Sequence, residues 1–158
     1  MRADATSLAA YGTDALGKGS LPDVAVLPGS VHEIAAIARL CSGASIPLVV
    51  RGAGTGYTGG AVPTRGGVVV SMERLNRMLE IDEVNLLAVV EPNVITGDLQ
   101  RAVESVGLFY PPDPASLETS SIGGNVAECA GGFGIRRSVT LVMIASVPSE
   151  PTRSWVRS

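Results

Sequence analysis

The chain has 158 residues and a formal net charge of −3, and its composition is 46% hydrophobic and 17% charged. These values describe a globular domain with a sizeable core and exclude a disordered chain. The 12 Lys and Arg residues are scattered, and no apolar run approaches the roughly 20 residues needed to cross a bilayer. Neither nucleic-acid binding nor a transmembrane segment is therefore expected.

The N-terminus has no apolar segment of the kind found in secretory signals. Its two cysteines, Cys41 and Cys129, lie far apart in the sequence and form no C-x-x-C pair. We therefore expect reduced thiols in a cytosolic protein and no structural metal.

Two helices are predicted from capping signals and hydrophobic spacing. Ser30 and Glu33 form a capping box, apolar residues recur at helical spacing after it, and Gly43 is placed to stop the helix. A second amphipathic helix is predicted over about residues 96–106, where a glycine again follows. His32 is the only histidine, and its place in the first turn of the first helix indicates a surface position.

Strands are predicted where β-branched residues cluster between turn signals. They cover Ile46–Val50, Val68–Ser71, Met78–Asp82, Leu86–Glu91 and part of Val139–Val147. The third and fourth form a pair that turns at residues 83–85. The charged residues near that pair are interpreted as a solvated face; they are Glu73, Arg74, Arg77 and Glu80. Helices and strands in this order predict a small α+β domain.

A glycine-rich segment, residues 51–60, directly follows the first predicted strand. It holds five of the chain's 19 glycines, and such a loop can turn its backbone N–H groups inward to hold an anion, usually a phosphate. No Lys follows the glycines, which excludes a P-loop for ATP or GTP. Arg51 abuts the loop, where it could touch a pyrophosphate or form an ion pair that orders the loop. The segment predicts a nucleotide-type cofactor held by its pyrophosphate.

Residues 54–59 also match the G-x-G-x-x-G pattern of NAD-binding proteins. That pattern needs a helix that begins inside the motif. Here Gly60 and Pro63 follow, and both disfavour a helix. NAD binding is therefore the weaker alternative, and a glycine-rich turn without any ligand is another.

A second cluster, residues 111–132, combines prolines, hydroxyl side chains and paired glycines. Prolines fix the path of the chain, hydroxyls and an amide supply hydrogen-bonding groups, and glycines allow close backbone contact. Two such segments in one chain predict two walls of one elongated site.

About residues 8–132 contain two motifs in order, V-x-R-G-A-G-T-G-x-x-G-G-A-x-P and Y-x-P-D-P-x-S-x-x-x-x-S-I-G-G-N-V-A-E-x-A-G-G. Together they resemble the FAD-linked oxidases of the vanillyl-alcohol-oxidase/PCMH type, and within them the glycolate oxidase flavin subunit and D-lactate dehydrogenase group. The resemblance implies a PCMH-type FAD-binding domain, of which the first subdomain and the start of the second are present. It also implies oxidation of a small 2-hydroxy acid such as glycolate or D-lactate, and partner subunits that carry electrons onward.

The resemblance further implies which residues hold FAD. Some relatives attach the flavin through a His in the first loop, but His32 lies outside that loop, so FAD is expected to bind non-covalently. The family's base and substrate anchor belong to parts not matched here, so no catalytic residue and no metal ligand is assigned. The implied cofactor-binding residues are Gly52, Ala53, Gly54, Thr55, Gly56, Gly59, Pro112, Asp113, Ser120, Ile122, Gly123, Gly124, Asn125, Ala127 and Gly131.

The sequence divides at about residue 132. Residues 1–132 fit the N-terminal part of the FAD-binding domain, whereas 133–158 depart from the family pattern, which we interpret as a frameshift or truncation; the end resembles a frayed tail. The substrate domain would then be absent. Two functions stay open: the flavin-binding portion of an oxidoreductase, or an inactive flavin-binding remnant. Alone, the chain is expected to be marginally stable and inactive, and to be cytoplasmic, with peripheral contact at the inner membrane as the alternative.

Overall fold

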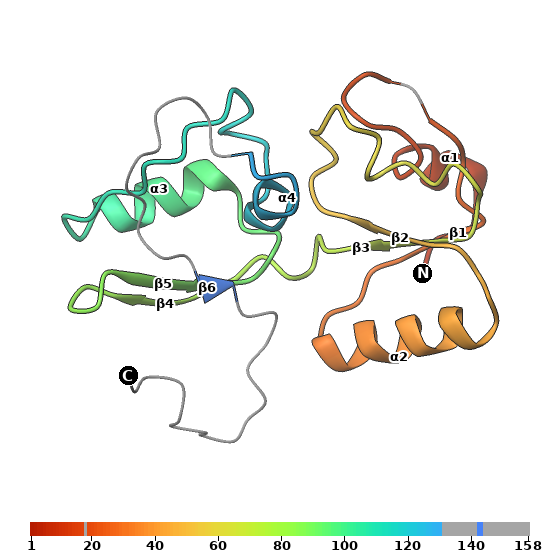
Figure 1. Ribbon diagram of the computed structural model, residues 1–158, viewed down its shortest axis with the longest axis horizontal. Coiled ribbons are helices and arrows are strands. Elements are labelled where there is room, and N and C mark those ends of the chain that lie inside the picture. Colours follow the sequence, from red (N-terminus) through yellow and green to blue (C-terminus); the bar gives the residue numbers. More distant parts are fainter. Residues whose placement is uncertain (18, 131–141, 144–158) are drawn as a thin grey trace.

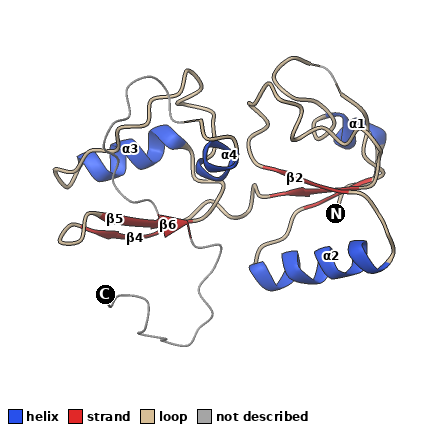
Figure 2. Cartoon of the chain, in the orientation of Figure 1, coloured by secondary structure: helices blue, strands red, loops and turns tan. Residues whose placement is uncertain are grey.

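The computed structural model describes residues 1–17, 19–130 and 142–143, which form two lobes, each with its own sheet (Figure 1). Figure 2 shows that both lobes combine helices with strands, as an α+β domain requires. The elements in chain order are α1 (Ala5–Ala9), β1 (Val24–Val26), α2 (Val31–Gly43), β2 (Leu48–Arg51), β3 (Val68–Ser71), β4 (Met78–Asp82), β5 (Leu87–Val90), α3 (Thr96–Glu104), α4 (Ile122–Ala127) and β6 (Val142–Met143). None of the helices in the described ranges has the length and apolar character needed to span a membrane.

The first lobe is built on a parallel sheet in the order β1-β3-β2. All four residues of the central strand β3 are buried, because α1 and α2 cover opposite faces of the sheet (Figure 1). Val68 and Val70 pack in one core cluster with Cys41 of α2, whereas Val69 packs with Leu8 of α1. A strand covered on both faces has no solvent side, which explains its three consecutive valines and the small Ser71 that follows them.

The N-terminus of α2 confirms the predicted capping signal. The Ser30 hydroxyl accepts a hydrogen bond from the Glu33 N–H at 3.3 Å, and the Glu33 carboxylate accepts one from the Gly29 N–H at 2.6 Å. In a standard capping box the carboxylate accepts from the N–H of the capping residue, whereas here it accepts from the residue before it. The N–H groups of Gly29 and Glu33 are both satisfied. The helix ends at Gly43, as predicted.

The second lobe places α3 and α4 on one face of a sheet in the order β4-β5-β6 (Figure 1). Strands β4 and β5 are antiparallel, and β6, which lies within the predicted 139–147 segment, pairs in parallel with β5. The core of this lobe contains Val90, Leu99 and Ile122, each fully buried. Helices α3 and α4 are therefore held to the sheet by apolar contacts from β5.

The ends of several predicted elements differ by one or two residues. The strand predicted from Leu86 begins at Leu87, because Leu86 has a left-handed backbone (φ 56) and belongs to the turn. The strand predicted over 46–50 is shifted to β2, and the helix predicted to residue 106 ends at Glu104. Sequence analysis missed the short elements α1, β1 and α4. Of these α4 matters most, because it lies inside the second glycine cluster, which was expected to be a loop.

The charged residues near the β4–β5 pair are exposed, as predicted, but they are not merely solvated. Arg77 forms an ion pair with Glu91 at 2.7 Å, and the Glu91 side chain is only 1% exposed. The Arg74 guanidinium donates to the Leu27 carbonyl at 2.9 Å. The Glu73 carboxylate accepts from the Tyr11 hydroxyl at 3.0 Å. These side chains tie parts of the chain that are distant in sequence.

Candidate functional site

The first glycine-rich segment leaves the carboxyl end of β2 and lies against α4. The Ala53 N–H donates to the Ser121 hydroxyl at 3.2 Å. The next three N–H groups, of Gly54, Thr55 and Gly56, belong to partly buried residues and donate to no residue in the described part of the chain. Consecutive N–H donors without a partner among the described residues, next to an anchored one, are what an anion-binding nest requires.

Arg51 holds the base of this loop through a carbonyl group. Its guanidinium donates to the Thr13 carbonyl at 2.6 Å and occupies the space that a Cβ atom on Gly54 would need. Partial burial lowers the pKa of Arg51 from its ordinary value, with no loss of charge near neutral pH. Arg51 could contact a pyrophosphate or order the loop, and the geometry agrees with loop ordering. The contact is a hydrogen bond to the Thr13 carbonyl and not the expected ion pair with a carboxylate.

The second cluster begins as an ordered segment and continues into α4. Gln100 donates from its amide to the Tyr110 carbonyl at 3.2 Å and to the Pro112 carbonyl at 2.7 Å, which fixes the approach to the helix. Pro112 is buried and Asp113 is exposed, and neither makes a hydrogen bond to the glycine loop within the described residues. The described contacts therefore do not bring Pro112 and Asp113 to the loop.

Helix α4 owes its position to close packing rather than to helix propensity. Ile122 lies fully buried in the core, and its N–H donates to the Val94 carbonyl at 2.9 Å, so neither its side chain nor its N–H is open to a ligand. The Gly123 N–H donates to the Pro92 carbonyl at 2.8 Å, and a Cβ atom on Gly123 would lie 2.8 Å from Pro92. The absence of a side chain at this position therefore lets the helix approach the segment after β5. Gly123 serves helix packing whether or not it also meets a ligand.

One face of α4 lies along the glycine loop. The Ser121 hydroxyl occupies the space of a Cβ atom on Gly52, and a Cβ on Gly124 would lie 3.2 Å from the same hydroxyl. Seven residues further on, the Glu128 carboxylate accepts from the Thr58 hydroxyl at 2.8 Å. A Cβ atom on Gly56 would lie 2.7 Å from that carboxylate. The two glycine clusters therefore meet, as the prediction of two walls of one site requires.

The buried Asn125 side chain points to the start of α3 and not to the glycine loop. Its amide donates to the Thr96 hydroxyl at 2.7 Å, which in turn lies 2.9 Å from the Ser120 hydroxyl and donates to the Ser120 carbonyl at 3.1 Å. All three side chains are buried. The amide therefore ties α4 to the start of α3, which favours the alternative that Asn125 fixes the turn over direct contact with a ligand.

Replacing Asn125 with Ala is expected to lower the free energy of unfolding by about 1–2 kcal/mol, because the buried Thr96 hydroxyl would lose the hydrogen bond that it accepts from the amide. Urea unfolding followed by circular dichroism measures this change. The matched control is Asn85→Ala, since the Asn85 amide also donates to a side chain, that of Asp82, but at an exposed turn. Equal stability loss in the two variants would contradict a special role for the buried network.

The remaining implied residues lie at the edges of this arrangement. Gly59 has a left-handed backbone (φ 78) with open space around it, and Ala127 is exposed near the end of α4. Gly131 lies outside the described residues. An open cavity of about 340 Å³ adjoins the loop and is lined by residues that include Tyr57, Thr58, Gly59 and Asp14. The loop thus has accessible space on its outer side.

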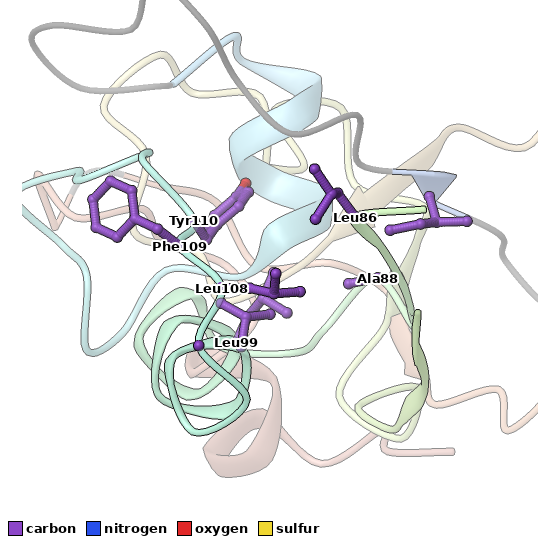
Figure 3. A pocket seen from close by; sticks show the side chains of 9 residues that line it. Leu86, Ala88, Leu99, Leu108, Phe109 and Tyr110 are labelled. Atoms are coloured by element: carbon purple, nitrogen blue, oxygen red, sulfur yellow. The ribbon is translucent and has the colours of Figure 1, made fainter. Parts of the chain in front are cut away.

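A second cavity, of about 260 Å³, lies in the other lobe between β5, α3 and residues 107–110 (Figure 3). Leu86, Leu99 and Leu108 contribute to its wall, and Phe109, at the rim, is 64% exposed. Its lining is almost entirely apolar and includes no residue of either glycine cluster. This cavity therefore offers nothing to hold a phosphate.

The described residues contain no group of three or more His, Cys, Asp and Glu side chains that could hold a metal ion. His32 is exposed in the first turn of α2, which agrees with its interpretation as a surface residue. Among the described residues, the carboxylate that contacts the glycine loop is that of Glu128, which accepts from the Thr58 hydroxyl. The part of the chain that the structure describes therefore supports binding rather than a catalytic assignment.

Three residues that join the two clusters were not predicted from the sequence, namely Ser121, Thr58 and Glu128. Ser121 was available from the pattern, because it directly precedes the Ile-Gly-Gly sequence. Thr58 and Glu128 are 70 residues apart, and only the fold brings them together.

Comparison with protein families matches residues 22–147 to the family described as "FAD binding domain". The match covers most of the chain, so this protein belongs to that family of FAD-binding domains, and FAD is its cofactor. The geometry fits, because the loop offers free N–H donors and the places where Cβ atoms would obstruct it are glycines. The fold is that of a PCMH-type FAD-binding domain, which confirms the resemblance seen in the sequence.

Individual relatives agree with the family. The chain is 51% identical to glycolate oxidase subunit GlcD of Bacillus subtilis (strain 168) over 122 residues, which is 77% of this chain and 26% of the relative. It is 38% identical to D-lactate dehydrogenase of Anaerostipes hadrus over 133 residues, 81% of this chain and 28% of the relative. The solved 4-ethylphenol oxidase of Gulosibacter chungangensis superposes with a TM-score of 0.67 at 33% identity, over 78% of this chain and 25% of that one. The chain thus spans about a quarter of the length of these proteins.

Proposed function

We propose that this chain is the flavin-binding portion of an FAD-dependent oxidoreductase that oxidises a small 2-hydroxy acid, such as glycolate or D-lactate. The observation that carries the proposal is the run of N–H groups at Gly54, Thr55 and Gly56, which have no partner in the described part of the chain, with α4 packed beside it. The names of the two relatives, a glycolate oxidase subunit and a D-lactate dehydrogenase, support this substrate class.

The residues of the glycine loop would hold the pyrophosphate of FAD, and α4 would form the adjoining wall. When bound, FAD accepts the hydride from the carbinol carbon of the substrate, so the protein's task is to bind and orient. The only histidine lies on α2 and not in the glycine loop, which supports non-covalent attachment. The base, the substrate anchor and the partner subunits that carry electrons onward belong to the whole protein in this proposal.

Titration of the purified 158-residue chain with FAD tests the binding half of the proposal. We expect saturable quenching of flavin fluorescence, and an affinity for riboflavin that is at least about tenfold weaker, because riboflavin lacks the pyrophosphate. NADH serves as the control for the G-x-G-x-x-G alternative and should leave the melting temperature unchanged. Absence of FAD binding, or equal affinity for riboflavin, would contradict a pyrophosphate site in this loop.

An activity assay tests whether the chain alone catalyses the reaction. With FAD, an artificial dye acceptor and either glycolate or D-lactate, we expect the chain alone to show no turnover above free flavin. The chain would then act as a flavin-binding portion that needs further protein for catalysis. Turnover by the chain alone would show that it builds a substrate site of its own and would overturn this part of the proposal.

A further inference from the structure

The glycine loop is attached to α4 at two points, and the free N–H donors lie between them. At the first point the Ala53 N–H donates to Ser121, at 3.2 Å. At the second, the Thr58 hydroxyl accepts from the Gly60 N–H at 3.4 Å and donates to the Glu128 carboxylate at 2.8 Å. The loop is therefore fixed at both ends, while its central donors remain available.

The backbone that carries the Glu128 side chain is fixed by hydrogen bonds at the end of α4. The Glu128 N–H donates to the Gly124 carbonyl at 3.1 Å, and the Ala130 N–H donates to the Asn125 carbonyl at 2.8 Å. Cys129 between them is left-handed (φ 53), the usual way in which a helix closes. Asn125 itself is tied to Thr96, so the end of α4 is anchored to the second lobe.

We propose that Glu128 and Thr58 form a latch that sets the geometry of the glycine loop before the cofactor binds. In this role they are positioning residues: Glu128 packs on Gly56 and accepts from Thr58, and neither needs to touch the cofactor. A loop without the latch would have to order its N–H groups when the ligand arrives, which costs conformational entropy and weakens binding. The expected effect of the latch on FAD affinity rests on the proposed function. Its expected effect on the order of the loop does not.

Hydrogen exchange of the ligand-free 158-residue chain is the direct test. We expect exchange of the Ala53 and Gly60 amides, which donate hydrogen bonds at the two attachment points, to accelerate about fivefold or more in Glu128→Ala and Thr58→Val, because both variants lose the Thr58–Glu128 hydrogen bond. Glu128→Gln and Thr58→Ser keep an acceptor and a donor, so they should exchange like the wild type. Glu104→Ala, an exposed glutamate at the end of α3, is the matched control for loss of charge.

FAD affinity provides the second measurement. Glu128→Ala and Thr58→Val should bind FAD about five- to tenfold more weakly, with little change for riboflavin. Wild-type exchange in both variants would overturn the latch, as would a Glu128→Gln variant that behaves like Glu128→Ala. Tighter FAD binding by Glu128→Ala would also overturn it, because the carboxylate would then oppose the pyrophosphate. If the wild-type chain binds no FAD, the proposed function fails, and the exchange rates still decide the latch.

Discussion

Replacing Gly54 with Val is expected to lower FAD affinity by about 100-fold or more, equivalent to roughly 2.7 kcal/mol. Gly54 has a left-handed backbone (φ 73), which a β-branched residue adopts only at a high cost. The new side chain would also collide with the Arg51 guanidinium and push it away from the Thr13 carbonyl. Both effects disturb the three free N–H donors, and fluorescence titration with FAD measures the result.

Gly107→Val is the matched control for this substitution. Gly107 is also left-handed (φ 77), lies beyond the end of α3, and has no atom within 4 Å of its Cβ position. It should lose stability through backbone strain alone and keep its FAD affinity. Wild-type affinity in Gly54→Val would show that the loop is only a turn. A Val at Gly56 would act differently, because the Gly56 backbone is not left-handed and the new side chain would collide with the Glu128 carboxylate.

Local signals in the sequence predict those parts of the fold that local interactions determine. The Ser30 cap and Gly43 bound α2 correctly because a helix end depends on neighbouring residues. The β3 strand is correct because four consecutive β-branched or small residues suit a strand buried on both faces. The glycine loop is also predicted correctly as irregular, because glycine disfavours helix and strand and allows the positive φ seen at Gly54 and Gly59.

Helix α4 shows why the rest could not be predicted. Its six residues include two glycines, each of which costs about 1 kcal/mol in a helix relative to Ala, so a local interpretation favours a loop. The helix forms because Ile122 enters the core and Gly123 packs against Pro92, and both contacts need the completed second lobe. The contacts of Ser121 and Glu128 with the loop depend on that helix, so they could not be predicted without it.

The ion pair between Arg77 and Glu91 was missed for a related reason. Arg77 precedes β4 and Glu91 follows β5, so they meet only when the two strands pair in the observed register. The Glu91 carboxylate accepts from the Arg77 backbone N–H at 2.8 Å and from its guanidinium at 2.7 and 3.1 Å. A single buried carboxylate thus satisfies backbone and side-chain donors at the start of the second lobe.

Glu91→Gln is expected to lower the free energy of unfolding at pH 7 by about 2 kcal/mol, because charge-assisted hydrogen bonds to a buried acceptor are replaced by weaker ones. The control is Glu118→Gln, which removes the charge from an exposed pair with Arg101 and should change stability little. Urea unfolding of both variants and the wild type measures the difference. Equal stability of wild type and Glu91→Gln would contradict a structural role for the pair.

The same pair has a defined pH dependence. Hydrogen bonds from Arg77 lower the pKa of Glu91 below its ordinary value, although burial acts in the opposite direction. A carboxyl group with a lowered pKa in the folded state stabilises the protein above the pKa it has when unfolded, about 4.3 for Glu. That stabilisation is lost as the pH falls through the lower folded value. The advantage of the wild type over Glu91→Gln should therefore be full at pH 6–7 and shrink progressively below about pH 4. An advantage that grew on acidification would mean that burial, and not Arg77, dominates the titration of Glu91.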